Sequence, residues 1–412
     1  IEAISHLTQG LKILQALPES AQRDQLELAF QTALSPVLMA ARGWSAPEVG
    51  TAIERAQQLC SKYGTLEDQF FVMWGLWGWR VIRADMDICE GIAHDIMKLV
   101  ETSTEGKELL PEAYWVVGCT AYYKGDFTNG LKLLEQGRAL TDPEKERGYA
   151  LKTGQHCSSM CSSHTGLALW QLGFPAQAQQ RADESIRLAK EAGHPFSYAM
   201  SLFFGRQVLQ FCGRDLDALD RIEEEYKICH EQGFLFFEVH AIFGRGDLLL
   251  REGNVVEARE LFNQGLAMLS GAGANLSMDH PYRNIAEAYL LAGLPNDAQE
   301  WLDRGFDLVE KHHERGMESE FLRLKGKLAL ASGDEKGAEA CYQSALEVAR
   351  LQHARSWELR TMISFAELMQ RQQRLSEGRL MLESVYNFFT EGFDTVDLLR
   401  AKALLRELES ER

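Results

Sequence analysis

The segment from His156 to His164 carries the densest group of side chains that could bind a metal ion. If this segment is helical, Cys157, Cys161 and His164 share one face, because residues at positions i, i+4 and i+7 lie above one another. Thiolates and imidazoles are zinc ligands, but a structural zinc site takes four ligands and usually has loop spacing. No partner cluster occurs, so we favour a closely packed Ser- and Cys-rich inner helix and expect no cofactor. The metal site remains the alternative.

A second group is aromatic and consists of Phe70, Phe71, Trp74, Trp77 and Trp79, with Trp44 upstream. Such rings could form a cage around a cation or an apolar ligand. On a helix, Trp74 and Trp77 lie together while Trp79 points away, so the three cannot all line one pocket. We therefore expect core packing between repeats, with some rings facing a groove.

Motifs for catalysis are missing from the sequence. It has no phosphate loop ending in GK[ST], no G-x-S-x-G elbow, no H-E-x-x-H and no paired carboxylates with a supporting base. We therefore expect no catalytic residue and no enzyme activity in this chain. The full-length protein could still carry a cyclase or ATPase module.

Charge and cysteine usage restrict the partners and the compartment. A net charge of −17 disfavours nucleic acid and anionic membranes as partners. The eight cysteines show no paired framework, which indicates a reducing, cytoplasmic compartment. The longest apolar run, residues 70–79, is too short to span a bilayer.

The elements that would position these residues repeat at a fixed interval. Glycines recur every 40 residues, and an alanine follows each glycine by five; the pairs are Gly173/Ala178, Gly213/Ala218, Gly253/Ala258, Gly293/Ala298 and Gly333/Ala338. A period of 20–50 residues is the signature of a solenoid. Further turns near Gly43, Ala84 and Gly125 extend the array toward the amino terminus.

The interval from Gly125 to Gly173 is longer, which places an insertion in residues 141–155. We expect a single solenoid over 1–412, with amino-terminal repeats in 1–140, regular repeats in 156–391 and a capping helix in 394–410. The apolar side of that helix is expected to hold Val396, Leu399, Ala403, Leu404 and Leu408.

Two further columns identify the kind of repeat. Gly166, Gly246, Ala286, Gly326 and Ala366 form a small-residue column, and large apolar residues follow the alanines by four. A small residue, an alanine and a large apolar residue at these spacings are the tetratricopeptide arrangement, whose standard period is 34. The expected fold is all-α, a right-handed superhelical solenoid of about nine long, period-40 tetratricopeptide-like helix pairs with a carboxy-terminal cap.

Solenoids bind ligands on the concave face, which the first helix of each pair forms. Positions next to the small column should face that groove, where Arg206 is unusual because it replaces a small residue. The inferred partner- or ligand-binding residues are Met160, Ser163, His164, Phe203, Arg206, Gln207, His240, Phe243, Asp247, His280, Arg283, Asn284, Glu287, Arg323 and Lys327.

Three stretches resemble a known region, namely residues 6–11 (HLTQGL), 74–79 (WGLWGW) and 389–395 (FTEGFDT). They are similar to the long tetratricopeptide region that follows an ATPase module in bacterial signalling proteins. Many of those proteins are class III adenylate/guanylate cyclase fusions, and others are MalT-like regulators. The resemblance implies a regulatory scaffold belonging to a larger polypeptide.

Three hypotheses for function follow. The first is a non-catalytic scaffold that binds a protein or peptide segment, for which a basic segment would suit the acidic chain. The second is a sensor that binds a small effector in the groove and controls an upstream ATPase or cyclase module. The third is self-association into a homo-oligomer.

Overall fold

The computed structural model of the protein describes all residues except 1, 103, 271–272 and 411–412. In this described part the chain folds into helices without a β-strand, as predicted. Nine helix pairs make up most of it: α2 (Ala21–Arg42) with α3 (Pro47–Tyr63), α4 (Leu66–Val81) with α5 (Met86–Glu101), α6 (Leu110–Tyr123) with α7 (Phe127–Leu140), α9 (Cys157–Gln171) with α10 (Pro175–Ala192), α11 (Pro195–Cys212) with α12 (Asp215–Gln232), α13 (Leu235–Arg251) with α14 (Val255–Leu269), α15 (Asp279–Leu291) with α16 (Pro295–His312), α17 (Glu318–Ala331) with α18 (Glu335–Leu351), and α19 (Arg355–Arg371) with α20 (Leu375–Tyr386).

Four elements lie outside these pairs: α1 (Glu2–Gln15), the 3-10 helix η1 (Glu105–Leu109), α8 (Pro143–Thr153) and α21 (Val396–Ser410). Helix α8 occupies the segment in which we placed the insertion. Helix α21 covers α19 and α20 and closes the array. None of the helices in the described ranges is long and apolar enough to cross a membrane.

The buried side of the capping helix differs from the prediction. Its buried residues are Leu398, Ala401, Leu404 and Leu408. Leu399 is instead 53% exposed. Both sets follow a three- to four-residue spacing, and contact with α19 and α20 selects one of them. The prediction was right for Leu404 and Leu408 and wrong for Val396, Leu399 and Ala403, because the sequence pattern contains two overlapping apolar faces.

The turn within each pair explains the recurring glycine. Gly173 has a φ of +92°, a left-handed conformation that favours glycine. Its N–H donates to the carbonyl of Trp170 at 3.1 Å, and the N–H of Phe174 donates to the carbonyl of Leu169 at 2.9 Å, which caps the end of α9. Ala84 and Gln373 take the same positive φ, so the turn persists where glycine is absent.

The small-residue column makes room for aromatic rings. A Cβ on Gly246 would lie 2.7 Å from the ring of Phe262, and one on Gly326 would lie 2.5 Å from Tyr342. The first helix of each of these pairs therefore approaches a ring on the second. The alanine column is fully buried beside it, as expected for a packed interface.

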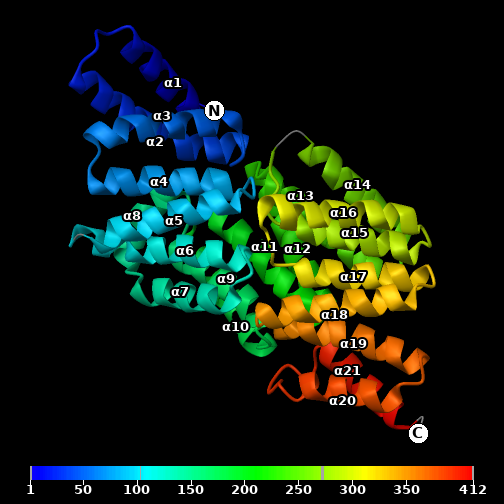
Figure 1. The fold of residues 1–412 in the computed structure, drawn as a ribbon. Coiled ribbons are helices and arrows are strands. Elements are labelled where there is room, and N and C mark those ends of the chain that lie inside the picture. The colour runs from blue at the N-terminus through cyan, green and yellow to red at the C-terminus, as the bar shows by residue number, and fades with distance from the viewer. Residues whose placement is uncertain (1, 103, 271–272, 411–412) are drawn as a thin grey trace.

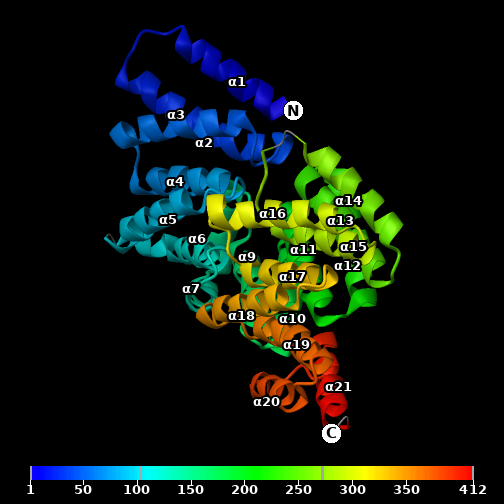
Figure 2. The same cartoon turned by 45° about the vertical axis from the view of Figure 1, so that its right-hand side comes forward.

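Successive turns of the superhelix touch, and we call this contact the seam. The Ser356 hydroxyl donates to the carbonyl of Trp170, 186 residues away, and the rings of Trp170 and Trp357 lie 4.6 Å apart. At a second point of the seam, the N–H of Arg315, just before α17, donates to the carbonyl of Tyr123 at the end of α6, at 2.9 Å. In Figures 1 and 2 helices α18 and α19 accordingly lie beside α9 and α10, whereas the two ends of the chain lie at opposite ends of the molecule. The seam closes much of the concave face.

Candidate functional site

A cavity of about 500 Å³ remains inside the superhelix between the amino-terminal and central repeats. Its walls come from the inner helices α4, α6, α9 and α11, from the turn between α2 and α3 and from the start of α13. Leu269, Ala274, Leu276 and Ser277 complete them. Ten aromatic residues line it: Trp44, Trp77, Trp115, Tyr123, Phe196, Phe203, Phe204, Phe234, Phe236 and Phe237. We call it the aromatic cavity.

Ring packing fixes the shape of the aromatic cavity. The rings of Trp77 on α4 and Trp115 on α6 meet edge to face at 4.8 Å. Trp44, in the turn after α2, stacks on Phe196 of α11 at 5.6 Å and 10°. The three tryptophans also belong to the buried or half-buried core, so the walls are held by the same contacts that hold the repeats together. The cavity is therefore preformed.

The seam supplies another wall. The backbone N–H groups of Asn275 and Leu276 both donate to the carbonyl of Ile82, at 3.0 and 3.1 Å. The Asn275 side chain donates to the carbonyl of Arg83 at 3.4 Å. Residues 274–277 are thereby fastened to the end of α4, where Ala274, Leu276 and Ser277 line the cavity.

Two polar atoms among the lining residues have no hydrogen-bond partner in the described part of the chain. They are the indole nitrogen of Trp115 and the amide oxygen of Gln155, and both are buried. The Gln155 amide nitrogen, by contrast, lies 3.6 Å from the sulfur of Met200. A buried polar group without a partner costs stability. One unpaired donor and one unpaired acceptor thus lie in side chains that form the wall of this cavity.

His164 is another polar residue of the lining, and the fold supplies hydrogen-bond partners for it. Its Nδ1 lies 3.1 Å from the carbonyl of Met160, so Nδ1 carries the proton. Its Nε2 lies 3.4 Å from both the Cys119 thiol and the Tyr123 hydroxyl, which can donate to it. Burial lowers the pKa of His164 to about 4. The ring is therefore neutral, and the cavity offers a ligand no charge.

The residues of the weak metal candidate do not converge. The sulfurs of Cys157 and Cys161 are 4.0 Å apart, but the His164 ring points to α6 instead. Within the described ranges, no group of three or more His, Cys, Asp or Glu side chains is arranged to hold a metal ion. Burial and the mutual contact of Cys157 and Cys161 raise the pKa of the Cys157 thiol, which favours its protonated form.

The residues inferred for the groove separate into two sets. His164 and Phe203 line the aromatic cavity. Met160 and Ser163 are fully buried in helix packing, as are most of the others; only His280, Glu287 and Lys327 are half-buried. The inner face is thus largely closed rather than an open groove.

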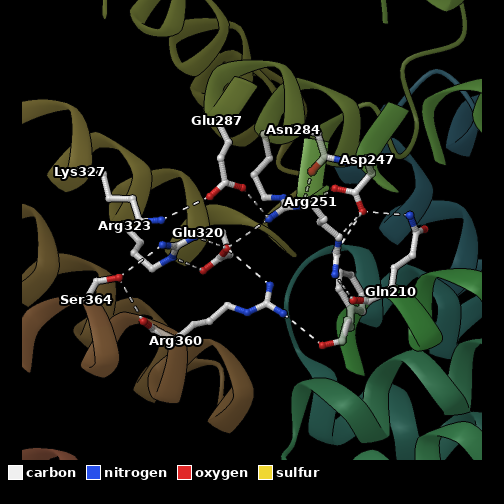
Figure 3. Close-up of polar contacts among 12 residues, drawn as sticks. Gln210, Asp247, Arg251, Asn284, Glu287, Glu320, Arg323, Lys327, Arg360 and Ser364 are labelled. Carbon is white, nitrogen blue, oxygen red and sulfur yellow. Dashed lines mark hydrogen bonds and ion pairs between the residues drawn. The ribbon is translucent and has the colours of Figure 1, made fainter. Parts of the chain in front are cut away.

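Most of the charged residues that we inferred for the groove meet in a buried ion network, which connects α13, α15, α17 and α19 (Figure 3). Glu320 accepts two hydrogen bonds from Arg323, at 2.7 and 3.0 Å, and Arg283 and Arg360 both approach it to 3.8 Å. Burial disfavours ionisation of Glu320, but these three guanidinium groups lower its pKa. Lys327 adds a contact to Glu287 at 3.3 Å.

Arg206 neither reaches solvent nor points free into a groove. Its Nε donates to the fully buried Glu225 of α12 at 2.6 Å. Its remaining nitrogens donate to the carbonyl of His240 at 2.6 Å and to Gln210 at 2.9 Å. Gly244 makes room for it, since a Cβ there would lie 2.8 Å from the guanidinium. Arg206 is therefore an internal ion-pair residue.

Sequence reasoning found Phe203 but missed other cavity residues, namely Trp115, Gln155, Phe196, Phe204, Phe234, Phe236 and Phe237. One signal could have found Trp115, which follows Trp74 by 41 residues, the interval between the amino-terminal turns. Trp77 and Trp44 were in the aromatic group that we assigned to packing, and they do both: they pack and they line the cavity. Trp79 points away and packs on Gly50, as the helical spacing predicted.

Comparison with known proteins identifies the fold of the chain. No family model matches the sequence. An uncharacterized protein of Rhizobium meliloti (strain 1021) is 23% identical over 376 residues, which cover 89% of this chain and 36% of that protein. The chain therefore spans about a third of the length of this relative.

Two solved structures are similar in architecture. A Rap protein complexed with Competence and Sporulation Factor has a TM-score of 0.62 at 12% identity, covering 85% of this chain and 97% of that one. The apo form of the quorum sensor NprR from B. thuringiensis has a TM-score of 0.50 at 12% identity, covering 86% and 97%. At these identities the likeness concerns the fold alone, and the chain has the fold of tetratricopeptide-like helical solenoids.

Proposed function

We propose that this chain is a regulatory sensor domain that binds a small, neutral, mostly apolar effector in the aromatic cavity. The observation that carries the proposal is the pairing of an aromatic lining with two unpaired polar atoms, Trp115 Nε1 and Gln155 Oε1. A volume of about 500 Å³ lies in the range of small-molecule sites, which are apolar with a few polar groups that orient the ligand.

The lining defines the chemistry of the effector. The effector would carry one acceptor for the indole N–H of Trp115 and one donor for the amide oxygen of Gln155. Its remaining surface would be aromatic or aliphatic, since rings form most of the wall. A charged group is disfavoured because His164 is neutral and the described lining residues include no Asp, Glu, Lys or Arg that could offset the cost of desolvation.

The test uses tryptophan fluorescence, because three tryptophans line the cavity. The full chain is titrated with a panel of neutral aromatic and aliphatic compounds, and its melting temperature is recorded in parallel. A binder should quench the fluorescence and raise the melting temperature with its concentration. Replacing Trp115 by phenylalanine keeps a ring and removes the N–H, so we expect about tenfold weaker binding.

Trp79→Phe is the matched control. Its indole N–H is likewise buried without a partner in the described part of the chain, but it lies against Gly50, outside the cavity lining. The affinity should stay within about twofold of wild type. If the two variants lost affinity equally, or if no compound in the panel raised the melting temperature, the cavity would not be an effector site.

A protein or peptide segment is the second candidate ligand. Repeat arrays present extended concave surfaces to such partners. The inner-face charges of this chain are already paired with one another, as in the network around Glu320. A peptide would therefore have to place an apolar anchor in the aromatic cavity, and it would compete with the small effector in the fluorescence titration.

The setting in a larger protein is part of the same proposal. The chain spans about a third of its Rhizobium meliloti relative, and three of its stretches resemble the region that follows an ATPase module in cyclase fusions and MalT-like regulators. Effector binding would then control an attached module. An activity assay of the full-length protein with and without the effector tests this step.

A further inference from the structure

A second, separate cavity of about 350 Å³ lies beside α8, on the outside of the amino-terminal repeats. Its lining comes from η1, the start of α6, the end of α7 and α8. Glu112 and Glu146 are its buried acids, while Glu108 and Lys145 lie at its exposed rim and pair at 2.8 Å. We call it the acidic pocket.

The fold pairs Glu146 but leaves one carboxyl oxygen of Glu112 without a partner among the described residues. Glu146 accepts hydrogen bonds from the backbone and hydroxyl of Ser158, at 2.6 and 3.1 Å, and its carboxylate lies 3.2 Å from His156. Glu112 is only 4% exposed, yet its Oε2 has no partner among the described residues. Because Glu112 is a lining residue of the pocket, a ligand that donates a hydrogen bond could supply the partner that this oxygen lacks.

The surrounding charges favour a cation. The carboxylates of Glu108, Glu112, Asp142 and Glu146 line the acidic pocket against two lysines, one of which is already bound to Glu108. Burial, and to a lesser degree the nearby Glu146, raises the pKa of Glu112 to about 8. A bound cation would favour the ionised form and so be drawn to this group.

The shape of the lining narrows the class of cation. A single unpaired oxygen suits a point donor such as an ammonium better than the two-pronged fork of a guanidinium. Pro111, Leu140 and Tyr149 add apolar surface that suits a short aliphatic chain. No set of three ligating side chains in the described ranges is placed for a metal ion.

We propose that the acidic pocket binds a primary ammonium group on a short aliphatic chain, with Glu112 as its ion partner. This chemistry has two sources, a free aliphatic amine or the lysine side chain of a peptide. The proposal does not depend on the aromatic cavity, because the two cavities share no lining residue.

Calorimetric titration of the full chain tests it with two probes, 1,5-diaminopentane for the free amine and Nα-acetyl-lysine methylamide for the side chain. We expect at least one to bind, and Glu112→Gln to weaken that binding about tenfold or more. Tighter binding of the diamine assigns a free amine, and tighter binding of the lysine derivative assigns a peptide.

Glu144→Gln is the control, since Glu144 is exposed on α8 and does not line the pocket; binding should change less than about threefold. 1-Pentanol tests the charge on the unaltered protein and should not bind. The proposal is overturned if neither amine binds at about 10 mM, if Glu112→Gln binds as wild type does, or if 1-pentanol binds as well as the amine.

Discussion

Replacing Arg206 by methionine should destabilise the protein by about 3 kcal/mol near pH 8. Burial raises the pKa of Glu225 to about 7, although Arg206 opposes this. Without Arg206 the Glu225 carboxyl would stay protonated at about pH 8, which is one unit above its pKa. This protonation lowers the free energy of unfolding by about 1.4 kcal/mol. The carbonyl of His240 and the amide oxygen of Gln210 would each lose a donor, at about 1 kcal/mol apiece.

The cost of Arg206→Met should depend on pH, because Glu225 changes its protonation state. Because the pKa of Glu225 is higher in the folded state, the folded protein keeps a proton that the unfolded chain releases above its ordinary value of 4.5. This contribution to stability is complete below the ordinary pKa and is lost as the pH rises to about 7. At about pH 5, Glu225 is protonated with or without Arg206, so the cost of Arg206→Met should fall to about 2 kcal/mol.

Urea unfolding followed by circular dichroism at the two pH values measures both quantities. The double variant Arg206→Met/Glu225→Leu is the control, because it removes the buried carboxylate together with its partner. It should recover only the carboxylate part of the cost and stay about 2 kcal/mol below wild type at both pH values, because the His240 carbonyl and the Gln210 amide oxygen still lack a donor. A single variant that costs less than about 1 kcal/mol, or a double variant as unstable as the single one at about pH 8, would refute the account of this ion pair.

Three further predictions concern packing and charge. Gly326→Ala should lower the free energy of unfolding in urea by about 1–3 kcal/mol, because its Cβ would lie 2.5 Å from a buried tyrosine ring. Gly91→Ala has open space at its Cβ and should instead stabilise α5 by up to about 1 kcal/mol. Trp357→Ala should cost about 3–5 kcal/mol and speed proteolysis at the seam, since its ring is fully buried there; unchanged cleavage would contradict this. Burial, and then the nearby Asp279, raises the pKa of Glu314, and burial raises the pKa of Asp279 to about 7. The free energy of unfolding should therefore fall as the pH rises from about 4 to 7. Glu314→Gln should make this fall less steep.

Local sequence patterns were enough to predict the repeat architecture. The glycine turn, the alanine column and the small-residue column each arise from contacts within one pair of helices, so their spacing is visible in the chain. Gly326 facing Tyr342 is such a contact, between residues only 16 positions apart. Arg206 stood out by its type, but its partner Glu225 could not be identified because nothing in the period marks it.

The aromatic cavity could not be predicted in the same way. It depends on how tightly the superhelix winds, which sums small rotations over many repeats. The wall at residues 274–277 meets Ile82 only because successive turns touch. The sequence therefore indicated inward-facing residues such as His164 and Phe203, but not that a cavity with an unpaired Trp115 in its wall would lie among them.

The seam also has a consequence for the order of folding. Contacts within a pair form between neighbours in sequence, whereas Asn275 and Arg83 are 192 residues apart. Contacts at such separations form late, because loop closure must precede them. During synthesis, helices α2 to α11 can pack before residues 274–277 leave the ribosome. The aromatic cavity is therefore completed by a segment made long after most of its walls.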